Sequence, residues 1–101
     1  MDIKNLVYEA QKMQNKIQKI QKTLEKIMVQ GESGGGMVII TMSCKGEIQT
    51  LKIDKSLLHS NKDSEILEDL IVAAFNNARK KMKVKTNDYM LSTGLPDYPI
   101  F

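Results

Sequence analysis

An unbroken heptad pattern at the start of the chain limits the folds that the chain can adopt. Apolar residues follow one another at alternating spacings of three and four, with no proline or glycine before Gly31. This pattern predicts one long helix from Ile3 to Val29, with Asp2 as its N-cap. The apolar seam of this helix consists of Ile3, Leu6, Ala10, Met13, Ile17, Ile20, Leu24 and Ile27.

A helix of this length is too long for a small compact domain. At about 1.5 Å per residue it extends roughly 40 Å, whereas a chain of 101 residues makes one domain at most. Such a domain has a radius of gyration of about 13 Å. The helix must therefore project from the domain or pair with another chain. Because one small domain cannot cover the whole seam, we expect a homodimer that contacts through this seam.

β-Branched residues concentrate in the middle of the chain. Residues 37–43 and 47–53 have the length of strands and flank the short loop at residues 44–46, which favours a β-hairpin. A third short strand is expected at residues 29–33, and helices are expected to cover one face of this sheet. Alternation along residues 47–53 predicts one face with Gln49, Leu51 and Ile53, and another with Ile48, Thr50 and Lys52.

A short helical turn at residues 54–58 and a polar loop lead to a second long helix, capped by Asp63 or Ser64. Residues 63–78 contain four acids and no base, whereas five bases fall within residues 79–85. Acids first and bases last complement the helix dipole, but one or two bases satisfy it. We expect a single domain over residues 1–85 that ends with this helix, followed by a flexible or loosely docked tail over residues 86–101. The predicted fold is therefore α+β, with a three-stranded antiparallel sheet between two long helices.

The segment GESGGG at residues 31–36 has the spacing of a hydrolase nucleophile elbow around Ser33 and the glycines of a phosphate loop. An elbow needs a helix after the serine, but a strand is expected here. Residues 37–38 are Met and Val where a phosphate loop needs Lys and Ser or Thr. Asp54 and His59 follow Ser33 in triad order, yet they lie five residues apart in a polar loop. The sequence favours no enzyme, and it favours glycines that turn the backbone or lie against another backbone.

Several other classes of protein are disfavoured by composition. Cys44 is a single cysteine, which agrees with a reducing cytoplasm. Cys44 and His59 are too few soft ligands for a structural zinc site, so no metal or cofactor is expected. No apolar run approaches the length of a membrane span, so we expect no membrane contact and no small-molecule substrate.

Positive charge lies in two separated segments. Residues 1–30 carry six lysines against three acids, and residues 79–101 carry five bases against two acids. On a helical wheel, the lysines of the first segment fall in a sector about 120° wide, roughly opposite the seam. One interpretation is a solvated face; the other is a surface for phosphates. The candidate DNA-binding residues are Lys12, Lys16, Lys19, Lys22, Lys26, Arg79, Lys80, Lys81, Lys83 and Lys85.

The order of these motifs closely resembles the YbaB/EbfC family of bacterial nucleoid-associated proteins. The resemblance is carried by GESGGGMV at residues 31–38, GEIQTLKIDKSLL at 46–58 and LEDLIVAAFNNARKK at 67–81, together with the heptad helix and a GLP-containing tail. It implies a small cytoplasmic, nucleoid-located protein that binds double-stranded DNA. It also implies a tweezer-like homodimer whose long helices project from a shared core.

The residues themselves indicate how such a protein binds. Lysine neutralises phosphates as a point charge, and Arg79 is the single residue suited to bidentate base reading. We therefore expect duplex binding that is dominated by the phosphate backbone and has weak sequence preference. Two alternatives remain: an RNA-binding protein, and a protein-interaction scaffold in which the heptad seam recruits a partner helix.

Overall fold

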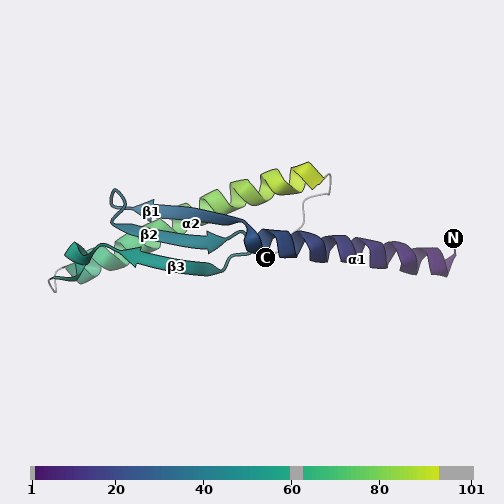
Figure 1. Cartoon of the computed structure of the whole chain (residues 1–101), viewed down its shortest axis with the longest axis horizontal. Helices are drawn as coiled ribbons and strands as arrows, with labels where there is room; N and C mark the ends of the chain where they lie inside the picture. The colour runs from purple at the N-terminus through teal and green to yellow at the C-terminus, as the bar shows by residue number, and fades with distance from the viewer. Residues whose placement is uncertain (1, 60–62, 94–101) are drawn as a thin grey trace.

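The computed structural model describes residues 2–59 and 63–93, which form two long helices and one three-stranded sheet (Figure 1). The antiparallel sheet has the order β1-β2-β3, which is also the order along the chain. The predicted α+β order of helix, three strands, helical turn and helix is confirmed. The elements are α1 (Ile3–Lys26), β1 (Met28–Ser33), β2 (Val38–Ser43), β3 (Ile48–Ile53), the 3-10 helix η1 (Lys55–Leu58) and α2 (Asp63–Thr93).

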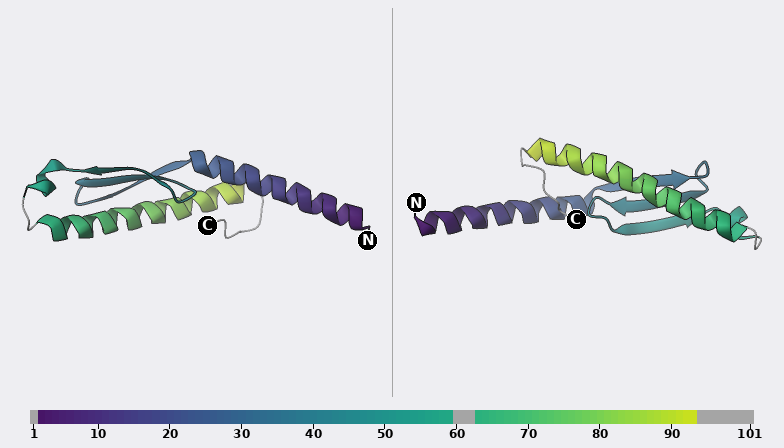
Figure 2. Two further views of the ribbon diagram at one scale, coloured as in Figure 1. Left: turned by 90° about the horizontal axis from the view of Figure 1, so that it is seen from below. Right: turned by 180° about the vertical axis from the view of Figure 1, so that it is seen from behind.

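Helix α1 projects from the rest of the molecule as a single arm (Figures 1 and 2). The backbone N–H of Lys4 donates to the Asp2 carboxylate, which confirms the predicted N-cap. Of the seam residues, Ile20 and Leu24 are buried, while the arm from Ile3 to Lys16 is exposed. The radius of gyration is 19.0 Å, well above the roughly 13 Å of a compact domain of this size. The predicted projection is thus present, and residues 3–16 of the arm are exposed in the part of the chain that the structure describes.

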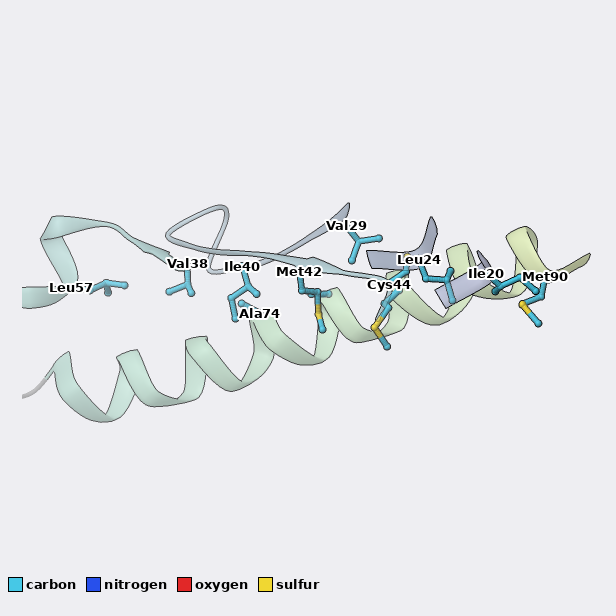
Figure 3. Close-up of a cluster of buried hydrophobic side chains, with 12 residues drawn as sticks. Ile20, Leu24, Val29, Val38, Ile40, Met42, Cys44, Leu57, Ala74 and Met90 are labelled. Carbon is cyan, nitrogen blue, oxygen red and sulfur yellow. The ribbon is translucent and has the colours of Figure 1, made fainter. Parts of the chain in front are cut away.

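Helix α2 covers one face of the sheet and packs most closely on β1 and β2 (Figure 2). Alternate residues of β2 point toward it, and its small residues allow a close approach. The buried core extends from η1 to the base of α1 (Figure 3), and it consists of Ile20, Leu24, Val29, Val38, Ile40, Met42, Cys44, Leu57, Ala74, Ala78, Met82 and Met90.

The predicted alternation along residues 47–53 is wrong at its start. Thr41 pairs with Thr50 but Met42 pairs with Ile48, so a β-bulge leaves Gln49 without a partner in the register. The extra residue of the bulge shifts the alternation of side chains by one, so residues on its two sides no longer follow a single alternating pattern. Ile48 therefore joins Leu51 on the face that α2 lies against, although strict alternation places the two on opposite faces.

The predicted end of the second helix near Lys85 is also wrong. Helix α2 continues to Thr93, and Thr86 and Met90 are buried on its inner side. These two residues extend the spacing of four that begins with Ala78 and Met82, so the same stripe keeps packing against the core. The last residues of the predicted tail, 94–101, lie outside the described part of the chain.

Candidate nucleic-acid interface

The five predicted lysines of α1 all lie on exposed positions of the projecting arm. Lys12 is placed over the Tyr8 ring, with Nζ 5.7 Å from the ring centroid. Among the described residues, none of these five lysines forms an ion pair with a carboxylate. The stripe therefore presents a row of exposed lysines along a helix that is about 36 Å long. Its members are Lys12, Lys16, Lys19, Lys22 and Lys26.

Glu25 is the acid that lies among the lysines of the stripe, and it forms a salt bridge with a residue outside α1. Lys45, in the turn between β2 and β3, donates from Nζ to Glu25 Oε1 at 2.6 Å. The hydrogen bond from Lys45, together with its charge, lowers the pKa of Glu25, and the same contact raises the pKa of Lys45. Glu25 therefore forms its salt bridge with a base of the hairpin turn, while the charges of Lys22 and Lys26 lower its pKa further. The contact also links the base of α1 to the hairpin turn.

The basic segment of α2 does not lie at the end of that helix. Residues 79–85 are in the middle of Asp63–Thr93, and the last turn contains no basic residue. Interaction with a helix dipole falls off within the last turn. The dipole therefore does not account for the five bases, contrary to the explanation that the sequence left open. Two explanations for these bases remain: a solvated face of the helix, or a surface that contacts a polyanion.

The bases of α2 face two sides of the helix. Lys80, Lys81 and Lys85 line a groove beside β1, together with Met28 and Gln30. A second hollow, on another side of α2, is lined by Asn76, Arg79, Lys80 and Lys83. The ten predicted residues therefore form several basic surfaces rather than one.

Lys45 is a basic residue that the sequence did not single out. It lines a hollow of about 280 Å³ with Arg79 and Lys83, so three bases from the hairpin turn and α2 come together. Lys45 lies in the turn between two strands, so no helical spacing in the sequence indicated that it lies near Arg79 and Lys83. The α1 stripe approaches α2 at another point, where Lys16, Lys19 and Ile20 share a hollow with Thr93.

The residues of the apparent catalytic motifs make structural contacts. Ser33 donates its hydroxyl hydrogen to the backbone carbonyl of Leu70 at 2.5 Å, which attaches β1 to α2. The Asp54 carboxylate caps η1 by accepting from the Ser56 N–H at 2.9 Å, and this bond lowers the pKa of Asp54. Gly34, Gly35 and Gly36 all have positive φ, as expected for a turn that only glycine adopts readily.

The described residues contain neither a cluster of metal ligands nor a helix that could span a membrane. Within residues 2–59 and 63–93, no three His, Cys, Asp or Glu side chains gather as they would around a metal ion. Neither of the two long helices, over the part of the chain that is described, is apolar enough to cross a membrane.

Comparison with known proteins identifies the family. Residues 1–94 match the model of the YbaB/EbfC DNA-binding family. The chain is 44% identical over 93 residues to the nucleoid-associated protein BAV0915 of Bordetella avium, which covers 90% of this chain and 84% of that protein. It also superimposes on the crystal structure of the uncharacterized protein HP0035 of Helicobacter pylori, with a TM-score of 0.77, 25% identity and coverage of 92% and 97% of the two chains. The chain therefore belongs to the YbaB/EbfC DNA-binding family.

Proposed function

We propose that this protein binds double-stranded DNA in the bacterial nucleoid, chiefly through phosphate contacts and with weak sequence preference. The observation that carries the proposal is the α1 stripe: five exposed lysines on a projecting arm, none of which forms a salt bridge among the described residues. An arm about 36 Å long spans about one turn of B-DNA, which measures 34–36 Å. Membership of a DNA-binding family and a relative named as nucleoid-associated support the same function in the cytoplasm.

The proposed binding unit is a homodimer. Beside the covered core, β3 and α2 leave a hollow of about 290 Å³ whose lining is apolar. Ile48 is 52% exposed there and Val72 is 59% exposed. The outer edge of β3 is the end of the sheet and pairs with no other strand in the described chain. A second copy seated on this surface would bury it, and the shared core would carry two lysine arms.

The N-terminal half of the α1 seam is a second part of the proposed contact. Leu6 and Ala10 are exposed, and neither belongs to the buried core cluster among the described residues. This supports contact with another copy through the seam, as the heptad spacing predicts. Because the lysines lie roughly opposite the seam, two arms that pack through this part of it would point their lysine sides outward, where duplex phosphates can reach them.

A salt series tests the DNA proposal. For about six phosphate contacts per dimer, log affinity is expected to fall against log salt with a slope near −5. Replacing Lys16 and Lys19 with Gln is expected to weaken binding to unrelated duplexes equally. It is also expected to flatten the slope by about 0.9 for each phosphate that is no longer neutralised. The double replacement of Lys52 and Lys55 is a matched control, because it removes the same charge from β3 and η1, away from the arm.

The results separate the alternatives. An unchanged slope in the Lys16 and Lys19 variant, with dimers intact, would show that the stripe is a solvated face. An equal loss of affinity in the Lys52 and Lys55 control would show that only net charge matters. Titration of double-stranded RNA in parallel distinguishes the RNA-binding alternative, for which RNA would bind at least as tightly as DNA.

A further inference from the structure

A groove of about 700 Å³ lies between the outer edge of β1 and the C-terminal half of α2. In Figure 1, α2 crosses behind the sheet and passes beyond the β1 edge, so helix and strand diverge there. The groove lies on the side of the sheet opposite the free edge of β3, away from the proposed dimer surface. Its lining consists of Met28, Val29, Gln30, Lys80, Lys81, Val84, Lys85 and Asp88.

The strand side of this groove presents unused backbone groups. The Glu32 N–H points away from β2, because it donates to Asn77 Oδ1 at 3.1 Å. In an antiparallel strand, backbone groups of alternate residues point to the same edge. The N–H and C=O groups of Gln30 and Met28 therefore point to the same outer edge. No backbone partner is found there within the described chain, so the edge offers a template for one more strand.

The helix side of the groove carries both apolar and basic side chains. Val84 lies between the lysines on α2 and is 63% exposed, while Val29 is buried at the strand. The lining of the groove contains three lysines, Lys80, Lys81 and Lys85, and one acid, Asp88. A ligand that fits must supply backbone hydrogen bonds, apolar side chains and negative charge together.

We propose that this groove binds an extended acidic segment of a partner protein, which adds to β1 as a fourth strand. Alternate side chains of an added strand point to the same face. One set would enter the groove, where apolar groups meet Val84 and carboxylates meet the lysines. Addition of a peptide strand to a free sheet edge is a general mode of recognition, in which the main chain provides affinity and the side chains provide specificity.

A DNA duplex fits the groove less well than a peptide. Phosphates can pair with the three lysines but make no favourable contact with the apolar Val84, and a duplex supplies no strand to the β1 edge. Since these lysines also belong to the predicted DNA-binding set, a bound acidic strand would compete with DNA for them. The peptide site itself does not depend on DNA binding.

The test uses the full-length protein and a fluorescent, acetylated octapeptide of the repeating sequence Val-Val-Glu-Glu, so that each face of the strand carries both valines and glutamates. Binding is measured by fluorescence anisotropy, and amide hydrogen exchange is followed by NMR. We expect exchange at the Met28 and Gln30 amides to slow at least tenfold with the peptide bound. The neighbouring Val29 and Gly31 amides, which face β2 in the paired register, are expected to change little. A purely ionic contact would not protect the edge amides.

Two controls sharpen this test. An octapeptide with the same charge but prolines at two central positions cannot pair as a strand, and we expect it to bind at least tenfold more weakly. Val84→Glu replaces an apolar lining residue of the groove with a negative charge and is expected to weaken binding of the original peptide at least tenfold. Leu91→Glu is the matched variant, since Leu91 is 70% exposed on the same helix but does not line the groove.

Equal binding of the two peptides would overturn the proposal and reveal a general affinity for polyanions. Unprotected Met28 and Gln30 amides in the bound state would also overturn it. Absence of peptide binding, with DNA binding intact, would refute this inference alone and leave the proposed function in place.

Discussion

Gly31 of β1 lies directly against the backbone of Ala78 in α2. A Cβ atom at residue 31 would overlap the Ala78 backbone nitrogen and the Ala74 carbonyl oxygen, neither of which is a flexible side chain. Unlike the three glycines that follow Ser33, Gly31 does not have a positive φ. Glycine is therefore needed at residue 31 because it has no Cβ, and not because the backbone there adopts a left-handed conformation. This contact lets α2 approach the sheet closely and fixes where the helix crosses β1.

Gly31→Ala is expected to destabilise the protein by about 2–3 kcal/mol, because an added methyl group forces strand and helix apart. Gly35→Ala is the matched control: no atom lies within 4 Å of a Cβ there, but φ is +66°. Its cost is expected to be the left-handed strain alone, about 1–2 kcal/mol. Urea unfolding at one protein concentration measures both. A larger loss of stability for Gly35→Ala would contradict this account of Gly31.

Lys45→Gln is expected to raise the pKa of Glu25 toward its ordinary value, since the Lys45 hydrogen bond is the main cause of its lowering. A carboxylate whose folded pKa is lowered stabilises the fold above its unfolded pKa and loses that contribution as pH falls through the folded value. Lys45, whose pKa is raised, stabilises the fold at pH values below its ordinary pKa of 10.5. This contribution is lost as the pH rises through the raised pKa. NMR titration of Glu25 measures the first effect.

The stability difference between wild type and Lys45→Gln is therefore expected to be present near neutral pH. It is expected to shrink as the solution becomes more acidic than the ordinary Glu25 pKa of 4.5. Lys55→Gln is the control, because Lys55 lies in η1 and forms no ion pair among the described residues. A Glu25 pKa that does not change in Lys45→Gln would contradict the predicted role of the contact.

Val72→Asp is expected to weaken the homodimer by at least about tenfold, or 1.4 kcal/mol, because it places a charge in the apolar hollow of β3 and α2. Ala73→Asp makes a similar change at the adjacent exposed position, which does not line the hollow. Light scattering over a dilution series measures the dissociation of each variant. Equal dimerisation of wild type and Val72→Asp would exclude this surface as the contact, and a monomeric wild type at micromolar concentration would exclude the tweezer arrangement.

Thr86→Val is expected to stabilise the fold by about 1 kcal/mol, because the buried Thr86 hydroxyl has no hydrogen-bond partner among the described residues. Valine preserves the shape and removes the unsatisfied polar atom. Thr86→Ser keeps the hydroxyl, removes the methyl group and is expected to destabilise. Thermal unfolding compares the three proteins, and destabilisation by Val would show that the hydroxyl has a partner in solution.

The α1 arm was predictable from the chain because its signal is local. Spacings of three and four place Ile20 and Leu24 on one side of a helix whatever lies beside it, and Asp2 marks its beginning. The length of this helix, compared with the size of the domain, was enough to predict that it projects. The hairpin and the third strand were likewise predicted from short-range composition and glycine positions.

The lysine stripe of α1 was predictable for the same reason, since helical periodicity gives the side of each lysine. The meaning of the α2 bases was not. Whether residues 79–85 satisfy a helix dipole depends on where the helix ends, and that end is set by the packing of Thr86 and Met90 against the core. The signal was present as a continued spacing of four, but polar residues around it obscured the pattern.

Contacts between distant residues were decided only by the tertiary structure. The bulge that brings Ile48 beside Leu51 depends on how β3 pairs with β2, and alternation in one strand carries no information about the register of its partner. Lys45 meets Glu25, and Gly31 meets Ala78, across 20 and 47 residues of chain. The sequence by itself determined which elements form and which faces are apolar or basic, because these follow from local periodicity. Packing decided which faces meet, and thereby where the grooves and uncovered surfaces lie.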